Sequence, residues 1–138
     1  KTGIAMEIRK TEWAVFTSRL NDRKFDAVTL AWSMGVESDP YQIWSSTQAE
    51  SGSNFVGFRN AVADGLIEKA RQEFDRTKRI ELYRKFSEIV NEEQPYTFLF
   101  CRKATVAVAK RFENVIVYPL GVDPIEWYVP QELQKYAE

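Results

Sequence analysis

The feature that most constrains the fold is an apolar pattern near the amino terminus that changes from strand-like to helical and back. Residues 3–9 alternate between apolar and polar side chains, as in a half-buried strand. Residues 11–22 then carry apolar side chains at helical spacing, and residues 25–32 form a continuous apolar run typical of a strand covered on both faces. This order predicts a parallel βαβ unit with a right-handed crossover.

Two longer helical patterns follow. Asn60 is a suitable cap for a helix that continues through Phe74, with an apolar face formed by Leu66, Ile67, Ala70 and Phe74. Asp75 begins a second helix, which extends to about Glu93 and is terminated by Pro95. Its inward-facing residues are expected to be Ile80, Tyr83, Phe86, Ile89 and Val90. Because the junction between the two helices is so short, we expect a helical hairpin that packs on itself and on the sheet.

The last third of the chain predicts short strands and an aromatic tail. Two β-prone runs, 97–101 and 105–109, are compatible either with a hairpin or with consecutive strands that bend apart. A turn is expected at 119–121. The tail around Trp127 and Tyr128 is expected to dock on the same molecule or on a neighbour.

The composition excludes several kinds of chemistry. The chain has no histidine, so it can have no histidine general base and no Ser-His-Asp site. Its single cysteine, Cys101, lies in an apolar run and is expected to be a small buried hydrophobe. Acidic and basic residues nearly cancel, which argues against a nucleic-acid surface. We expect neither a metal site nor a cofactor.

The predicted strand at 25–32 ends in a loop of small, acidic and turn-forming residues. In open α/β sheets, ligands bind at the carboxyl ends of the strands, so this loop is the candidate ligand-binding site. Its candidate residues are Trp32, Ser33, Met34, Gly35, Glu37 and Asp39.

Several short motifs follow one another in a characteristic order along nearly the whole chain. They are Glu12-Trp13-x-x-Phe16, Phe25-Asp26, Asp39-Pro40-Tyr41, Asn54-Phe55-Val56-Gly57-Phe58-Arg59-Asn60, Arg79-x-x-Leu82-Tyr83 and Gln94-Pro95-Tyr96. Together they resemble the carboxyl-terminal lobe of the family 5 extracellular solute-binding proteins, the peptide-binding subunits of ABC importers. The resemblance implies an α/β fold of the periplasmic-binding-protein type, built from the βαβ unit, the helical hairpin and further short strands.

The resemblance also implies a function and its partners. Residues 1–138 would form a single ligand-binding lobe of a longer, two-lobed protein, without its amino-terminal lobe. That protein would capture a peptide or a similar small solute between its lobes and deliver it to an ABC permease in the membrane. It would not be an enzyme, and it would be periplasmic or extracellular, either soluble or lipid-anchored.

One position departs from the family pattern. In peptide-binding members, an aspartate three residues after a tryptophan pairs with the amino group of the ligand. Counted from Trp32, that position here is Gly35. Glu37 or Asp39 could substitute for it. Asp39 precedes Pro40 and is better suited to form a turn or a cap. Trp32 is equally suited to flanking a ligand and to packing under the loop.

Other readings remain open at this point. Glu37 and Asp39 could instead be the acid/base pair of a carboxylate-dependent hydrolase. The aromatic tail could belong to a structural interaction domain.

Trp13 is expected in the core, on the apolar face of the first helix. Separated from its partner lobe, the chain is expected to expose apolar cleft-facing surface and to associate through it.

Overall fold

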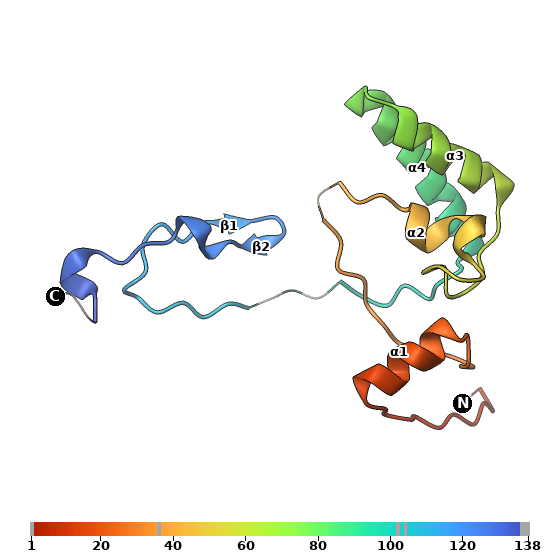
Figure 1. Cartoon of the computed structure of the whole chain (residues 1–138), viewed down its shortest axis with the longest axis horizontal. Helices are drawn as coiled ribbons and strands as arrows, with labels where there is room; N and C mark the ends of the chain where they lie inside the picture. The colour runs from red at the N-terminus through yellow and green to blue at the C-terminus, as the bar shows by residue number, and fades with distance from the viewer. Residues whose placement is uncertain (1, 36, 102, 104, 136–138) are drawn as a thin grey trace. The chain divides into compact units, whose positions relative to one another are not determined.

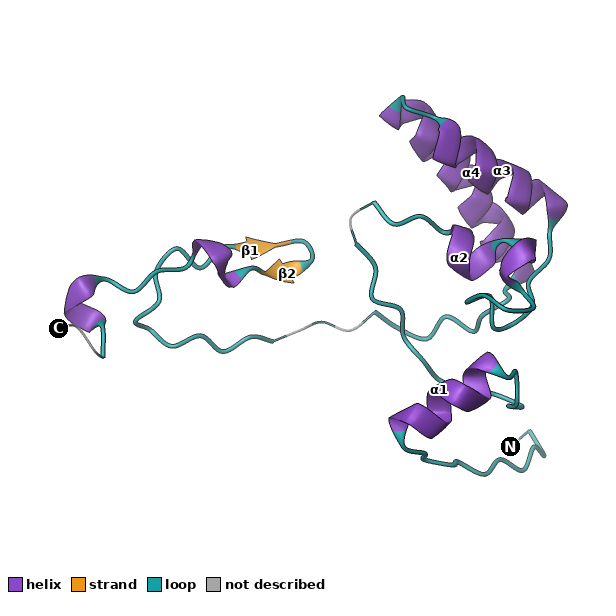
Figure 2. Cartoon of the chain, viewed as in Figure 1, coloured by secondary structure: helices purple, strands orange, loops and turns teal. Residues whose placement is uncertain are grey.

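The computed structural model describes residues 2–35, 37–101, 103 and 105–135. The chain divides into two compact units, the first formed by Lys1–Ser33 and Ser38–Phe98 and the second by Met34–Glu37 and Leu99–Glu138. The four α-helices of the described residues all lie in the first unit. The strands found among the described residues are two short ones in the second unit (Figure 2).

The first unit is centred on the predicted helical hairpin, α3 (Ala61–Gln72) and α4 (Arg76–Glu93), which lie side by side in Figure 1. The side-chain oxygens of Asn60 and Asp75 accept backbone hydrogen bonds from the first turns of α3 and α4, at 2.8 to 3.2 Å. Each cap satisfies N–H groups that have no partner within the helix. Gln94, just before Pro95, closes α4 in the left-handed conformation (φ 46°). The sequence therefore predicted both helices and both caps correctly.

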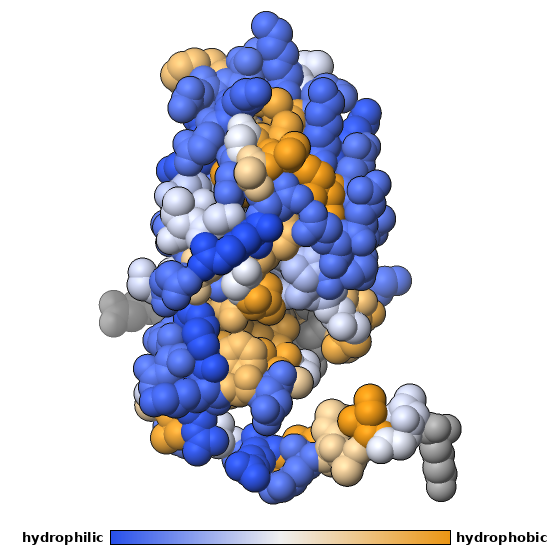
Figure 3. All heavy atoms as spheres, turned by 90° about the vertical axis from the view of Figure 1, so that its right-hand side faces the viewer, coloured by the Kyte–Doolittle hydropathy of each residue, from blue (hydrophilic) through white to orange (hydrophobic). Residues whose placement is uncertain are grey.

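The hydrophobic core lies between these helices and the loop that precedes them. Its buried members are Phe58, Ala63, Ile67, Phe86 and Val90, with Tyr41, Trp44, Leu66 and Ile89 packed around them. Two residues expected on the inward faces are exposed instead, since Phe74 at the tip of the hairpin is 97% exposed and Ile80 is 43% exposed. Figure 3 shows mostly hydrophilic residues over the hairpin, with some apolar side chains left uncovered between them.

The predicted amino-terminal helix is α1 (Trp13–Asn21), and Glu12 is its cap. The Glu12 carboxylate accepts from the N–H groups of the first turn. Leu20 is buried, but Trp13 is 65% exposed and stacks on Phe16 at 5.5 Å between ring centroids. The expectation that Trp13 lies in the core is therefore wrong for this chain. The sheet that the apolar face of α1 was expected to cover is not formed in the described residues.

The predicted strands at residues 3–9 and 25–32 have no regular secondary structure. Ile4, Met6 and Ile8 alternate as expected, but each is about 80% exposed (79, 78 and 79%). A strand satisfies its backbone groups only by pairing with a neighbour, and no ladder links these segments to other described residues. The expected parallel βαβ pairing is thus absent from the described residues, although α1 occupies the crossover position.

A short helix and a 3-10 turn follow the candidate loop. Pro40 is the cap residue of α2 (Tyr41–Trp44), and the Tyr41 N–H donates to the side chain of Asp39 at 3.0 Å. The 3-10 helix η1 (Ser46–Gln48) follows directly. The stretch from 45 to 54 therefore contains a helical turn and also buried residues, Ser45, Ala49 and Asn54.

The second unit contains a small antiparallel hairpin, β1 (Val117–Tyr118) and β2 (Gly121–Val122). Gly121 (φ 126°) has a positive φ that favours glycine, so the predicted turn at 119–121 is confirmed. The aromatic tail docks within the same unit. Tyr128 and Glu113 exchange backbone hydrogen bonds at 2.8 and 3.3 Å, and Trp127 packs on Phe112 at 5.8 Å between centroids.

The β-prone runs at 97–101 and 105–109 do not form strands. Arg102 and Ala104, in the expected connection between them, lie outside the described residues. Cys101 is exposed, so the expectation of a buried hydrophobe at this position is wrong. As at the amino terminus, the apolar side chains of an unpaired run remain uncovered, and Phe98, Leu99 and Phe100 are between 57 and 78% exposed.

Candidate functional site

The six candidate residues of the loop are divided between the two units. Trp32, Ser33 and Asp39 belong to the first unit, while Met34, Gly35 and Glu37 belong to the second. All six are exposed to solvent. Val36, between them, lies outside the described residues. The structure therefore places each group within its own unit, and the surroundings of the first group are the better defined.

Trp32 is a half-packed indole. Its ring stacks on Phe55 with 5.9 Å between centroids and 2° between planes, and 40% of the residue remains exposed. Its indole N–H donates to the Tyr96 hydroxyl. Burial raises the pKa of Tyr96, and this hydrogen bond partly offsets the rise. Trp32 is thus fixed on one face by packing and presents the rest of its surface to solvent, and its contact with a ligand stays a prediction.

Arg23 contacts Phe55, the ring on which Trp32 stacks. Its guanidinium lies over the Phe55 ring at 5.0 Å from the centroid. The Arg23 Nη2 donates to the carbonyls of Ala49 and Gly52, at 3.0 and 2.8 Å. The Arg23 Nη1 donates to the carbonyl of Asn21 at 2.9 Å. These bonds join the end of α1 to the turn after η1. The Phe55 ring, on which Trp32 stacks, is therefore in contact with a guanidinium that three backbone carbonyls hold in place.

Asp39 has a structural role in this unit. One carboxylate oxygen accepts the Tyr41 N–H, and the other pairs with the Arg71 Nε at 2.9 Å. The Arg71 guanidinium also lies over the Tyr41 ring at 4.2 Å. The pair is partly exposed, so its contribution to stability is modest. Its geometry nevertheless fixes the start of α2 against α3. The bond from the Tyr41 N–H is the local, turn-forming role that was predicted for Asp39.

Sequence reasoning missed the polar residue that organises the loop before α3. Asn54 is fully buried, and its amide donates to the carbonyls of Ser45 (3.1 Å) and Phe58 (2.8 Å). Its side-chain oxygen accepts the Phe58 N–H at 2.9 Å. The available signal was an Asn that opens a short segment containing Gly57, because asparagine readily bonds the backbone of tight loops.

A second bond fixes the same region from the side of α3. Asp64, in the first turn of that helix, accepts the Ser46 N–H at 2.8 Å. The Asp64 carboxylate therefore bonds the first residue of η1 rather than a backbone group of its own helix. Polar side chains that bond to backbone groups thus fix the conformation of the segment that follows the candidate loop.

Neither metal chemistry nor a membrane span is indicated by the described part of the chain. Its cysteine and carboxylate side chains form no group of three that could hold a metal ion. Among the helices built from described residues, none has the length and apolar character needed to cross a bilayer.

Comparison with known proteins identifies the class. No protein-family model matches the sequence. The chain is 31% identical over 121 residues to an oligopeptide-binding protein, AppA, of Bacillus subtilis, which covers 86% of this chain and 22% of the relative. It is 27% identical over 125 residues to a dipeptide-binding protein of Escherichia coli, covering 88% of this chain and 23% of the relative. The chain therefore spans less than a quarter of the length of these relatives.

The fold agrees with this relationship. The solved structure of Bacillus subtilis AppA in complex with a nonapeptide matches 93% of this chain and 26% of its own chain, with a TM-score of 0.78 and 29% identity. The chain is thus a relative of the oligopeptide- and dipeptide-binding proteins and has the corresponding periplasmic-binding-protein-like α/β fold. The resemblance and the fold class that the sequence indicated are confirmed.

Proposed function

We propose that residues 1–138 contribute one ligand-binding lobe to a longer peptide-binding protein of an ABC importer. In that protein, a peptide or a similar small solute is captured in a cleft between lobes and passed to a membrane permease. The observation that carries this proposal is the match over 93% of the chain to a protein solved with a nonapeptide bound. Extended peptides suit such a cleft because their backbone groups can be bound whatever their side chains.

The loop from Trp32 to Asp39 is the proposed peptide-contacting segment, with Ser33, Met34 and Gly35 contributing backbone groups. The packing of Trp32 supports this role, because a ring fixed on one face keeps its free edge in place for a ligand. Asp39 is already engaged by Arg71 and by the start of α2. Glu37, two residues after Gly35, is the proposed carboxylate that pairs with the amino end of the ligand.

The hydrolase alternative gains no support. It requires Asp39 to act with Glu37 as an acid/base pair, whereas Asp39 is bound by a guanidinium and a backbone N–H. The relatives are named as binding proteins. The proposed protein is accordingly a binding component that acts outside the cytoplasmic membrane, in the periplasm or at the cell surface.

A thermal-shift assay on the complete protein that contains this chain tests the proposal. A panel of peptides, sugars and metal chelates is compared at equal concentration, and peptides are expected to raise the unfolding temperature by mass action. Stabilisation by sugars or chelates alone would refute the proposed ligand class.

The assignment of Glu37 is tested separately with a nonapeptide carrying either a free or an acetylated amino end. Glu37→Gln is expected to reduce the preference for the free amine by about tenfold, the scale of a charge-assisted hydrogen bond. Asp39→Asn is the matched control and is expected to keep the preference while slightly lowering stability, because it weakens an exposed ion pair. Loss of the preference in Asp39→Asn alone would move the role to Asp39.

A further inference from the structure

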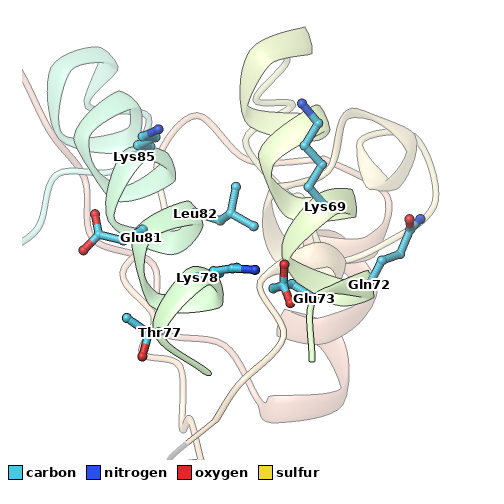
Figure 4. A pocket seen from close by; sticks show the side chains of 8 residues that line it. All are labelled: Lys69, Gln72, Glu73, Thr77, Lys78, Glu81, Leu82 and Lys85. Atoms are coloured by element: carbon cyan, nitrogen blue, oxygen red, sulfur yellow. The ribbon is translucent and has the colours of Figure 1, made fainter. Parts of the chain in front are cut away.

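A groove of about 540 Å³ runs between α3 and α4, towards the tip of their hairpin. Figure 4 shows its two walls. Lys69 and Glu73 line it from the α3 side, and residues of α4 line it from the other. The side chain of Leu82, half-buried, lies between the two helices. The groove is therefore an apolar strip with charged walls, on a face that uses none of the loop residues discussed above.

The lysines of the groove are not neutralised. Lys69, Lys78 and Lys85 all line it and are exposed, and no carboxylate in the described part of the chain lies within ion-pair distance of any of them. The two carboxylates of the groove have other partners. Glu73 accepts the Asp75 N–H at 2.8 Å, and Glu81 pairs with Arg84 at 3.3 Å. The groove thus presents three lysine ammonium groups that have no ion-pair partner among the described residues, and they outnumber its two carboxylates.

The spacing of these charges fits a particular kind of ligand. Lys78 and Lys85 are seven residues apart on α4, which places them about two turns, or roughly 10 Å, apart along the helix. Leu82 lies between them, and Lys69 lies on the opposite wall. A carboxylate-bearing segment with acidic side chains two helical turns apart and an apolar residue between them would match this pattern.

An exposed aromatic residue adjoins the groove. Phe74 follows Glu73 directly at the tip of the hairpin and is 97% exposed. A phenyl ring left wholly in water is unfavourable, and exposed aromatic residues are enriched where proteins contact partners. Phe74 therefore offers an apolar anchor beside the positive walls.

We propose that this groove, with Phe74, is a docking site for an acidic segment of a partner protein. The carboxylates of that segment pair with Lys69, Lys78 and Lys85, and an apolar side chain lies on Leu82. A groove between two helices accommodates a rod-like segment better than a flat surface, so the geometry favours a protein segment over a lipid bilayer. The attraction is electrostatic and should weaken as salt is added.

The test uses a fluorescein-labelled synthetic helical peptide with glutamates two turns apart on either side of a leucine, titrated with the full 138-residue chain. Fluorescence anisotropy is expected to show binding that weakens with salt, and a peptide with glutamine in place of glutamate should not bind. In ¹⁵N heteronuclear NMR spectra, the shifted amides are expected to cluster in α3 and α4. No binding, or shifts centred elsewhere, would overturn the proposal.

Charge-matched variants separate a site from general attraction. Combining Lys69→Glu, Lys78→Glu and Lys85→Glu is expected to weaken binding by about tenfold or more. Reversing Lys10, Lys103 and Lys110 changes the net charge equally at positions outside the groove, and is expected to weaken it by no more than about twofold. Equal losses in the two variants would refute a docking site.

A single apolar variant and a lipid control complete the test. Phe74→Ser is expected to weaken binding while leaving its salt dependence unchanged, since it removes an apolar anchor and no charge. Circular dichroism verifies that each variant keeps its helices. Groove-dependent binding to phosphatidylglycerol vesicles, without binding to the peptide, would replace the acidic segment with a membrane surface and so refute the proposal.

Discussion

The helical hairpin and the two unpaired apolar segments differ in where their backbone hydrogen bonds are made. α3 and α4 satisfy their N–H and C=O groups internally and bury Ile67 and Val90 against each other. Residues 3–9 and 25–32 have an equally clear apolar pattern, yet they remain unpaired. A helix needs only its own chain to form, whereas a strand needs a neighbour.

The difference explains which exposed surfaces are to be expected. The hairpin covers its own apolar face, while Ile4, Met6 and Ile8 present theirs to solvent. The chain matches less than a quarter of its relatives' length. A longer protein that contains it therefore has room for strands that pair with these segments. The predictions below test this contrast.

Hydrogen exchange should show the largest effect. Backbone amides in the middle of α3 and α4 are expected to exchange at least about a hundredfold more slowly than those of 3–9 and 25–32, because the latter make no ladder bonds. The measurement is made at two protein concentrations. Protection of 3–9 that rises with concentration would show association through these segments, as predicted for the isolated chain. Protection independent of concentration would break the contrast, because it would require pairing within one molecule.

Truncation of the hairpin core should have the next largest effect. Ile67 is fully buried between α3 and α4, so Ile67→Ala is expected to lower the free energy of unfolding by about 2 to 5 kcal/mol. Val62→Ala, on the same helix but 66% exposed, is the matched control and should change it by less than about 0.5 kcal/mol. Urea unfolding followed by circular dichroism at the helical band measures both. Similar values for the two variants would show that the hairpin has no packed core.

The parts of the fold that could be predicted from sequence are those governed by local chemistry. Asn60 and Asp75 cap helices because their side-chain oxygens reach N–H groups two and three residues away. Pro95 ends α4, and Gly121 permits the turn of the β1–β2 hairpin. None of these interactions depends on residues that are distant in sequence, so pattern and spacing were sufficient.

The features that depend on distant partners were predicted less well. Trp13, Phe74 and Cys101 were each expected to be buried because they lie in apolar patterns, and each is exposed. An apolar pattern indicates that a face can be covered but not which element covers it. Arg23 and Asn54 show the converse, because their bonds to backbone groups in other loops follow from the folded geometry and not from any periodicity.

The candidate site was predicted in part for the same reason. The capping role of Asp39 is local and could be predicted from Asp39-Pro40, while its ion pair with Arg71 joins residues on separate elements. Trp32 could be singled out at the end of an apolar run, but its stacking on Phe55 could not. The ligand contacts of the loop remain a prediction, which the amine-preference experiment tests.

The smallest expected effect belongs to the second unit, where two exposed phenol–carboxylate bonds accompany the hairpin and the tail. Tyr118 donates to Glu126, and Tyr128 donates to Glu113, each at 2.8 Å. Each hydrogen bond, reinforced by the negative charge of its carboxylate, raises the pKa of the tyrosine above its ordinary value of about 10. The neutral phenol is the form that donates, so the folded state favours it.

The sign of the pH dependence follows from that shift. The stabilisation is fully present below the unfolded pKa of about 10 and is lost as the pH rises through the higher pKa of the folded state. NMR titration of the tyrosine ring carbons measures each group separately. Glu126→Gln should lower the pKa of Tyr118 towards its ordinary value and leave that of Tyr128 unchanged, and Glu113→Gln should do the reverse. If either variant shifts both tyrosines, the two bonds are coupled, and the tail and the hairpin form one cooperative element rather than two local ones.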